Sequence, residues 1–346
     1  MGVEVKLKEA QIHLTNKCNL RCIFCDNQKL NVDDLPDEKW HEIVEELCNL
    51  NPFRLTISGG GEPLLRAKLL LEILNIGKYR KIKTSVITNG TLVTKSLAKE
   101  IVESECDEWR ESIHATTPRL DEFLRGKNML LQSFNGIKYI SEWKRKLNSD
   151  LPKIAIWMTL TKFNIHCIQP MIKKAASLGV NSIFLRMVNP PSRKDVYPTL
   201  TQRKKLVNKM KENELLANKV GIEFRCAFLS EDILPVKNNR GGDEGSFTCL
   251  VPFREIVIFA DGRVAPCCNF IKEDENSLAV ESVRKKRLKE IWFGEKFENF
   301  RAMMGKGFIP KECKGCTPDF KTMDREYRNL IQVNEAGKNS SIKFSF

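Results

Sequence analysis

The sequence lacks any apolar run that approaches the roughly 18 residues needed to cross a membrane. Its N-terminus, MGVEVKLKEAQIHL, also lacks the apolar region of a secretory signal. We therefore expect a cytoplasmic protein with no membrane partner. Repeats of fixed period and low-complexity tracts are absent too. A hydrophobic content of 42% with 29% charged residues is typical of a soluble globular protein, and 346 residues can bury one large core and a smaller second one.

Compact basic surface is also missing, although the net charge is +13. The basic residues are dispersed, and only KKRLK at 285–289 forms a run, which is typical of a solvated helix face. No aromatic RNA-binding motif accompanies the charge. Nucleic acid is therefore not the expected partner, and an anionic small molecule or an acidic peptide is equally compatible with the charge.

Cysteine is what the sequence has in excess, with twelve residues. A large, unsecreted chain argues against a disulfide framework, so clustered cysteines in a reducing compartment favour metal. Two spaced groups lie toward the two ends of the chain. The cysteines outside these groups are Cys48, Cys106, Cys167, Cys226 and Cys268.

Short apolar runs alternate with helix-period segments over the first half of the chain. One helix is predicted to begin near Pro36 and another to stop at Gly179. Six strand–helix units predict an α/β fold with a parallel sheet and covering helices, open or closed as a barrel, with chemistry at the carboxyl ends of the strands. The predicted strands are Gln11–Thr15, Arg54–Ser58, Thr84–Thr88, Ser112–Ala115, Ile154–Leu160 and Ser182–Val188.

The strand–helix alternation ends after a predicted helix at Thr201–Asn218 and a short predicted strand at Gly221–Arg225. Residues 235–247 are polar and glycine-rich and indicate a linker. FREIVIFADGRVAPCC then predicts a β-hairpin that turns at Asp261-Gly262. We expect three parts: residues 1–234, residues 235–325 and a tail at 326–346.

The first cysteine group, Cys18-x3-Cys22-x2-Cys25, follows the first predicted strand. Three thiolates on a tight loop can hold three irons of a [4Fe–4S] cubane and leave the fourth open for a chelating ligand. A zinc knuckle that lacks its fourth ligand, or cysteines that serve as small hydrophobic residues, remain alternatives.

Two further motifs end the next strands. Ser58-Gly-Gly-Gly-Glu62-Pro63 ends the second strand, and Thr88-Asn89-Gly90 ends the third. Successive glycines let backbone amides and carbonyls approach a small zwitterion closely. Because parallel strands end at the same edge of a sheet, one ligand could touch the cysteine loop and both motifs.

On these motifs the chain resembles the radical S-adenosylmethionine (SAM) superfamily over roughly residues 8–225. The resemblance implies a partial (β/α)6 TIM-type barrel in which the three cysteines bind the cluster and a flavodoxin- or ferredoxin-type protein donates electrons. The cofactor-binding positions that it implies are Phe24 near adenine, Gly60, Gly61 and Glu62 at the methionine amino group, Thr88 and Asn89 at the same edge, Ser112 and His114 near the ribose or adenine, and Arg186 at a carboxylate of the cofactor or substrate. A structural ion pair is the alternative role of Arg186.

The second cysteine group comprises Cys249, Cys267, Cys313 and Cys316. Four thiolates make a closed site that suits a full [4Fe–4S] cluster or structural zinc. The Cys-x12-Gly-x4-Cys portion resembles the SPASM extension of radical SAM enzymes, which favours a second, auxiliary [4Fe–4S] cluster. No cysteine follows Cys316, and position 322 is Thr322, so the resemblance implies the shortened, single-cluster Twitch form.

Cys268, directly after Cys267, stands where related sulfatase-maturing enzymes have a proton-accepting aspartate. A thiol there could donate a hydrogen atom to a substrate radical, as a radical epimerase requires. The alternative is a second buried cysteine in a turn.

The resemblance implies an enzyme that cleaves SAM reductively and abstracts hydrogen from a substrate. We expect a small molecule such as a sugar or aminocyclitol, with oxidation or epimerisation as the outcome. A maturase of ribosomal peptides is the alternative, and only about ten residues precede the first predicted strand, where such maturases often carry a leader-binding module. A zinc protein that binds nucleic acid is the distant third reading.

Overall fold

The computed structural model describes residues 5–25, 33–188, 194–226, 249–273 and 275–305, together with residues 310 and 313. Within them, ten strands form one curved sheet in the order β10-β9-β8-β1-β2-β3-β4-β5-β6-β7. The strands from β1 to β7 are parallel to their neighbours. They are β1 (Glu9–Ile12), β2 (Arg54–Ile57), β3 (Lys83–Thr88), β4 (Glu108–Ser112), β5 (Lys153–Leu160), β6 (Ser182–Met187) and β7 (Glu223–Cys226).

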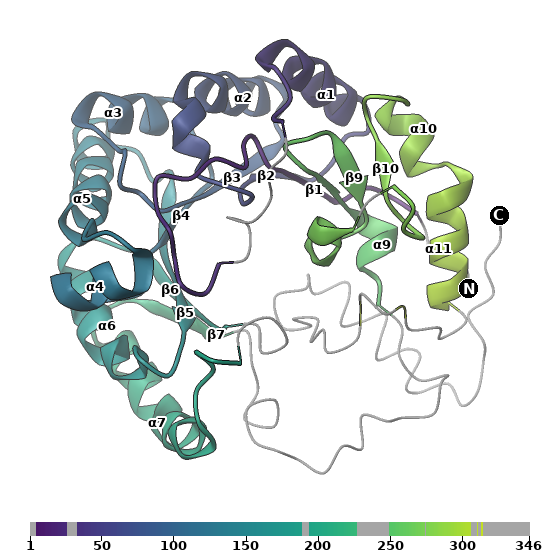
Figure 1. Ribbon diagram of the computed structural model, residues 1–346. Helices are drawn as coiled ribbons and strands as arrows, with labels where there is room; N and C mark the ends of the chain where they lie inside the picture. Colours follow the sequence, from purple (N-terminus) through teal and green to yellow (C-terminus); the bar gives the residue numbers. More distant parts are fainter. Residues whose placement is uncertain are drawn as a thin grey trace, which may run out of the picture.

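Helices line the outer side of this sheet, which makes the partial barrel that the sequence predicts (Figure 1). Strand β5 shows why: Ile156 and Met158 are fully buried toward the helices, whereas Trp157 and Thr159 alternate onto the inner face. The helices are α1 (Asp37–Asn49), α2 (Ala67–Arg80), α3 (Lys95–Glu103), α4 (Pro118–Arg125), α5 (Leu130–Lys146), α6 (Ile168–Ser177) and α7 (Leu200–Lys219).

The predicted helix limits follow local chemistry. Helix α1 starts after Pro36, with Asp37 and Glu38 in the first turn, where carboxylates interact favourably with the helix dipole. Helix α6 ends just before Gly179, whose φ of 75° is left-handed and suits glycine.

Two predicted strand limits were wrong. The fourth strand is Glu108–Ser112 rather than Ser112–Ala115, because EWRES buries Trp109 and Glu111 on one face while Glu108 and Arg110 lie on the other. The first strand is Glu9–Ile12, so it ends earlier than predicted. Consequently Ser112 is the last residue of β4, and His114 lies in the loop that follows it.

The predicted hairpin at the C-terminal side is confirmed. Strands β8 (Glu255–Ile258) and β9 (Arg263–Ala265) are antiparallel, and Gly262 between them has a φ of 91°. Strand β8 also pairs in parallel with β1, so the hairpin extends the barrel sheet instead of forming a separate one. The predicted boundary near residue 235 lies outside the described residues. The remaining elements are β10 (Glu281–Ser282), α9 (Val251–Arg254), α10 (Leu288–Trp292) and α11 (Glu295–Gly305).

A small second core supports this hairpin. Phe259, Phe270 and Phe300 are almost fully buried together, and Cys249 and Cys267 pack against them. In the part of the chain that the structure describes, no helix has both the length and the apolar character to span a bilayer.

Candidate functional site

The first cysteine group lies in the loop after β1 and rests on the C-terminal end of α4. The backbone amides of Arg21 and Ile23 donate to the carbonyls of Arg125 and Leu124, each at 2.9 Å. Within the loop, the amide of Cys25 donates to the carbonyl of Cys22 at 3.0 Å. The two bonds to α4 fix the loop backbone on both sides of Cys22, so the position of this cysteine depends on α4.

The three thiols of this loop, Cys18, Cys22 and Cys25, form no disulfide, and each disfavours ionisation of the others. The pKa of the Cys22 thiol is raised to about 12, mainly by burial and in smaller part by Cys25 and Cys18. Burial also raises the pKa of Cys18, with Glu62 and Cys25 adding to the effect. Thiols so placed lose their protons together only when a cationic centre offsets their charge, which fits iron–sulfur ligands.

Among the described residues, no three His, Cys, Asp or Glu side chains converge closely enough to bind one metal ion. Thiolates of a cubane each bind a different iron, so they stand farther apart than the ligands of a single ion.

The glycine-rich motif packs directly on the backbone that leads into the cysteine loop. The amide of Gly61 donates to the Thr15 carbonyl at 2.7 Å, and that of Glu62 donates to the Lys17 carbonyl at 2.8 Å. A Cβ on Gly61 would lie only 1.8 Å from the Lys17 oxygen, so only glycine fits. Beside it, the buried Nδ2 of Asn16 has no hydrogen-bond partner among the described residues, which leaves a donor at the position expected for the zwitterion.

Glu62 is 2% exposed and accepts three hydrogen bonds from the protein. They come from the Thr88 hydroxyl at 2.6 Å, the Asn89 amide at 2.7 Å and the Leu64 amide at 3.0 Å. Glu62 thus ties the end of β2 to the end of β3. Its predicted contact with the methionine amino group stays a prediction, which the neighbouring glycine backbone could fulfil as well.

Asn89 links the third motif to the cysteine loop. Its Nδ2 donates to Oδ1 of Asn19 at 2.8 Å, and Asn19 in turn donates to the Thr91 hydroxyl at 2.8 Å. The Asn89 carbonyl accepts from the Ser133 hydroxyl at 2.9 Å. The three motifs that the sequence places at strand ends are therefore joined by direct hydrogen bonds.

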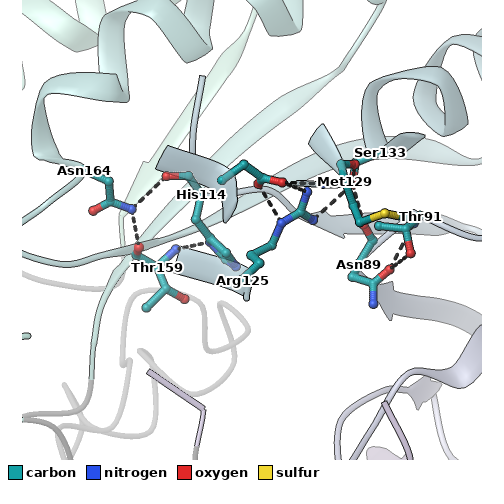
Figure 2. Close-up of polar contacts among 9 residues, drawn as sticks. Asn89, Thr91, His114, Arg125, Met129, Ser133, Thr159 and Asn164 are labelled. Atoms are coloured by element: carbon teal, nitrogen blue, oxygen red, sulfur yellow. Dashed lines mark hydrogen bonds and ion pairs between the residues drawn. The ribbon is translucent and has the colours of Figure 1, made fainter. Parts of the chain in front are cut away.

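A buried ion pair stands behind these loops and was missed by the sequence analysis (Figure 2). The guanidinium of Arg125 donates to both oxygens of Asp121 at 2.6 and 2.8 Å, and to the Ser133 hydroxyl at 3.1 Å. All three residues are fully buried. Asp121 also accepts from the Met129 amide at 2.9 Å. The only signal in the sequence was the i,i+4 spacing of Asp121 and Arg125, which surface helices share.

His114 is held as a neutral donor. Its Nδ1 accepts from the Thr159 amide at 3.1 Å, so the proton resides on Nε2 (Figure 2). Burial lowers the pKa of His114 to about 3, and the positive charges of Arg125 and Arg186 act in the same direction. Asn164 fixes the loop by donating to the carbonyls of His114 and Thr159, both at 2.9 Å.

Phe24 reaches the same place from the cysteine loop. Its ring stands edge-on to His114, with centroids 4.8 Å apart and an interplanar angle of 86°. The structure therefore brings Phe24 and His114 together, as expected for two residues near one adenosine. Ser112 ends β4 beside Trp157 of β5, and Arg186 lies two strands away on β6 with an exposed side chain.

The second cysteine group is partly described. Burial raises the pKa of Cys267 well above its ordinary value, and Cys268, Cys249 and Cys313 contribute as neighbours. These thiols therefore lie close together, although Cys249 and Cys313 are 64 positions apart in the sequence. Cys316 lies outside the described residues. Cys268 is exposed at the start of a short 3-10 helix, Cys268–Lys272, rather than buried in a turn.

Two family models match the chain. The model of the radical SAM superfamily matches residues 12–150, and that of the SPASM iron–sulfur cluster-binding domain matches residues 249–317. The first match contains the three motif loops, and the second contains the hairpin and the second cysteine group. Together these domains imply a radical SAM [4Fe–4S] cluster, SAM itself and an auxiliary cluster.

Relatives of two kinds align along most of the chain. The tungsten-containing aldehyde ferredoxin oxidoreductase cofactor-modifying protein of Pyrococcus furiosus is 22% identical over 328 residues, covering 90% of this chain and 87% of that protein. The PqqA peptide cyclase of Granulibacter bethesdensis is 23% identical, covering 88% and 78%. The crystal structure of Streptococcus suis SuiB bound to its precursor peptide SuiA superposes with a TM-score of 0.69 at 18% identity, covering 90% and 70%. The chain thus belongs to the radical SAM enzymes that carry a C-terminal SPASM-type iron–sulfur domain.

Proposed function

We propose that this protein modifies a peptide by radical chemistry: it cleaves SAM reductively and abstracts a hydrogen atom from a C–H bond of the peptide. The observation that carries the radical SAM part is the hydrogen-bonded convergence of the cysteine loop, the glycine-rich motif and the Asn89 loop at one edge of the sheet. The peptide part is supported by the likeness to a peptide cyclase along most of the chain.

A sugar or aminocyclitol, which the sequence analysis favoured, has no support among these relatives, and the peptide alternative fits them better. The short stretch before β1 weighed against a peptide in that analysis. It does not decide the substrate, because a leader can also be bound by a separate protein. A zinc protein that binds nucleic acid fits neither of the two matched domains.

The roles of the residues follow from their contacts. Cys18, Cys22 and Cys25 would hold the cluster; when reduced and combined with SAM, it supplies a carbon radical strong enough to attack an unactivated C–H bond. The backbone of Gly60 and Gly61 would bind the methionine end of SAM, with the Asn16 amide as a further donor. Phe24 would pack against adenine, and the Nε2–H of His114 would donate to the adenosine.

The test of this function uses anaerobically purified protein with dithionite and SAM. We expect about eight irons per chain and 5′-deoxyadenosine as a product. When the peptide substrate is deuterated, the 5′-deoxyadenosine should contain deuterium taken from the peptide. Precursor peptides encoded beside the gene are the first candidates to supply. Deuterium that appears in 5′-deoxyadenosine only with small metabolites, and never with peptides, would overturn the peptide proposal and leave the radical chemistry in place.

Cys268 offers a way to determine the outcome of the reaction. If its thiol donates a hydrogen atom to the peptide radical, a Cys268→Ser variant would cleave SAM but return no epimerised product. Its exposure beside the second cysteine group supports access to a substrate. An unchanged product from the Cys268→Ser variant would remove Cys268 from the mechanism, and the auxiliary cluster would then be the favoured acceptor of an electron from the radical.

A further inference from the structure

The inner face of β5 and β6 carries side chains that the function described so far does not use. On β6, Leu185 faces the helices in the main core, so Phe184 and Arg186 alternate to the opposite, inner face. On β5, Trp157 faces the same way, since its neighbour Met158 belongs to the main core. The register pairs Trp157 with Phe184. These side chains therefore lie side by side inside the barrel.

Two of them form an aromatic pair. The rings of Trp157 and Phe184 have centroids 4.6 Å apart and planes inclined by only 35°. The guanidinium of Arg110 lies 5.0 Å from the Trp157 ring and orients it by a cation–π contact. The pair begins next to Ser112, which pairs with Trp157 in the sheet. Ser112, the residue expected near the ribose, therefore neighbours this aromatic pair.

Two arginines on this inner face are paired with a glutamate of their own strand. Arg110 donates to Glu108 at 2.9 Å, and Arg225 donates to Glu223 at 2.7 and 2.8 Å. Arg186 is different, because no hydrogen bond or ion pair joins it to any residue that the structure describes. Its charge is felt by His114, which is neutral and cannot balance it. Arg186 thus presents a complete set of guanidinium donors to the inside of the barrel.

The distance from Ser112, the residue expected near the ribose, is appropriate for a substrate contact. Ser112, Trp157 and Phe184 lie on three successive strands, and strands are about 4.8 Å apart, so Phe184 lies about 10 Å from Ser112. Arg186 is two residues farther along β6, toward the carboxyl edge. A substrate whose C–H bond faces the adenosine would therefore extend across the two rings and reach Arg186 with its far end.

We propose that Trp157, Phe184 and Arg186 form a substrate subsite that binds a carboxylate-bearing segment of the peptide. The apolar part of the segment lies on the two rings, and the carboxylate makes a bidentate pair with the Arg186 guanidinium. A guanidinium is suited to this geometry because its planar donors match the two carboxylate oxygens. This proposal rests on the proposed function, since it takes a peptide as the substrate. It assigns to that peptide an Asp or Glu side chain, or a free C-terminal carboxylate, at a fixed distance from the modified position.

The test presents the reconstituted holoenzyme, with SAM bound, to two pools of random N-acetylated decapeptides that differ only at the C-terminus, carboxylate in one and amide in the other. Retained peptides are sequenced by mass spectrometry. We expect acidic residues to be enriched about tenfold, as one charge-assisted bidentate contact predicts. Enrichment in the amidated pool assigns the subsite to a side chain, whereas retention of only the free-carboxylate pool assigns it to the C-terminus.

Matched variants separate the subsite from the general charge of +13. Arg186→Gln should lose the acidic enrichment. Lys173→Gln, which removes one charge from the exposed outer side of α6, should keep it. Phe184→Ala should retain fewer peptides overall while preserving their acidic preference. Iron content and circular dichroism establish that each variant is folded.

Four results would overturn the proposal. Peptides retained with no acidic preference would remove the subsite and leave the peptide function standing. Equal enrichment by the wild type and Arg186→Gln would assign the preference to other charges. A rise in the KM for SAM in Arg186→Gln would assign the guanidinium to the cofactor carboxylate. No peptide retained above protein-free beads would overturn the subsite and the peptide function together.

Discussion

The two halves of the barrel edge differ in how their polar groups are used. On the β1–β4 side, the Glu62 carboxylate and the Asn89 side chain are buried and bonded to other loops of the same edge. On the β5–β7 side, Trp157 is only half-buried and Arg186 is exposed with no partner among the described residues. The polar groups of the β1–β4 side thus form a closed hydrogen-bond network, whereas the β5–β7 side is an open wall that leaves the Arg186 guanidinium available to a ligand.

This difference matches the two tasks that the chemistry imposes. SAM and its cluster must be held in one geometry for every turnover, and a fully bonded network provides that preorganisation. A substrate must enter and leave, so the surface that recognises it keeps unsatisfied binding capacity. Changes on the first side should therefore abolish SAM cleavage or lower stability, and changes on the second side should alter which molecule is accepted.

The largest effect is expected from Cys22→Ala. Because two sulfurs cannot hold the cubane with one open corner, the variant should lose the radical SAM cluster and form no detectable 5′-deoxyadenosine. Iron and sulfide analysis with electron paramagnetic resonance measures the loss, and high-performance liquid chromatography measures the nucleoside. Cys48→Ala, on helix α1 and away from both groups, is the control and should retain both signals. Normal cleavage by Cys22→Ala would contradict the assignment of the first loop.

The second prediction concerns the buried pair of Arg125 and Asp121. Arg125→Met leaves a buried carboxylate without its partner and should lower the free energy of unfolding by about 3–5 kcal/mol. Since the cysteine loop is bonded to the backbone of α4, the same variant should also bind less iron. Chemical denaturation of the apo-protein and iron analysis measure the two effects.

The exposed pair of Lys99 and Glu103 is a matched control with the same i,i+4 spacing. Lys99→Met should cost less than about 1 kcal/mol, because solvent screens an exposed pair. Equal losses from the two variants would mean that burial of the Arg125 pair contributes nothing, and the closed network would then not stabilise the first half of the edge.

The third prediction tests the close approach of the glycine-rich motif to the cysteine loop. Gly61→Ala would bring a methyl group against the Lys17 carbonyl, so the two loops must separate. We expect binding of SAM, measured by equilibrium dialysis, to weaken by about a hundredfold, or roughly 2.7 kcal/mol. Gly221→Ala is the control: it has a left-handed φ of 73° but nothing within 4 Å of the added carbon. It should lose some stability and no affinity.

The positions of the motifs could be predicted from the sequence because parallel strands end at one edge, so Cys18, Gly60 and Asn89 had to meet once the strand order followed the chain. The anchoring of the cysteine loop on α4 could not, since a backbone hydrogen bond from Arg21 to Arg125 leaves no trace in residue types. The pairing of β8 with β1 was equally hidden, because a hairpin pattern does not say which sheet it joins.

The buried ion pair of Asp121 and Arg125 could not be predicted from the sequence either. Asp121 and Arg125 stand four apart in a helix, and this spacing usually marks a solvated surface. Only the packing of α4 against Ser133 of α5 converts it into a buried pair. The fourth strand was misplaced for a related reason: its charged residues, Glu108 and Arg110, face the inside of the barrel and neutralise each other there.

The smallest effect concerns Glu111, which lies behind the Asn89 loop on the first side. Burial raises the pKa of its carboxyl to about 8, with a further contribution from the charge of Glu62. Between pH 4.5 and 8 the folded protein therefore keeps this proton, whereas the unfolded chain releases it. The contribution of the Glu111 proton to the free energy of unfolding is complete below pH 4.5 and is lost as the pH rises through 8. Glu111→Gln removes this dependence. We expect the free energy of unfolding of the apo-protein to fall between pH 5 and 8 by on the order of 2 kcal/mol more in the wild type than in the variant. Glu42→Gln, an exposed substitution on α1, should follow the wild type. If the free energies of unfolding of the wild type and Glu111→Gln depend on pH in the same way, the Glu111 carboxyl is already ionised in the folded protein. The β1–β4 side would then carry a buried charge behind the Asn89 loop and would not differ from the β5–β7 side in this respect.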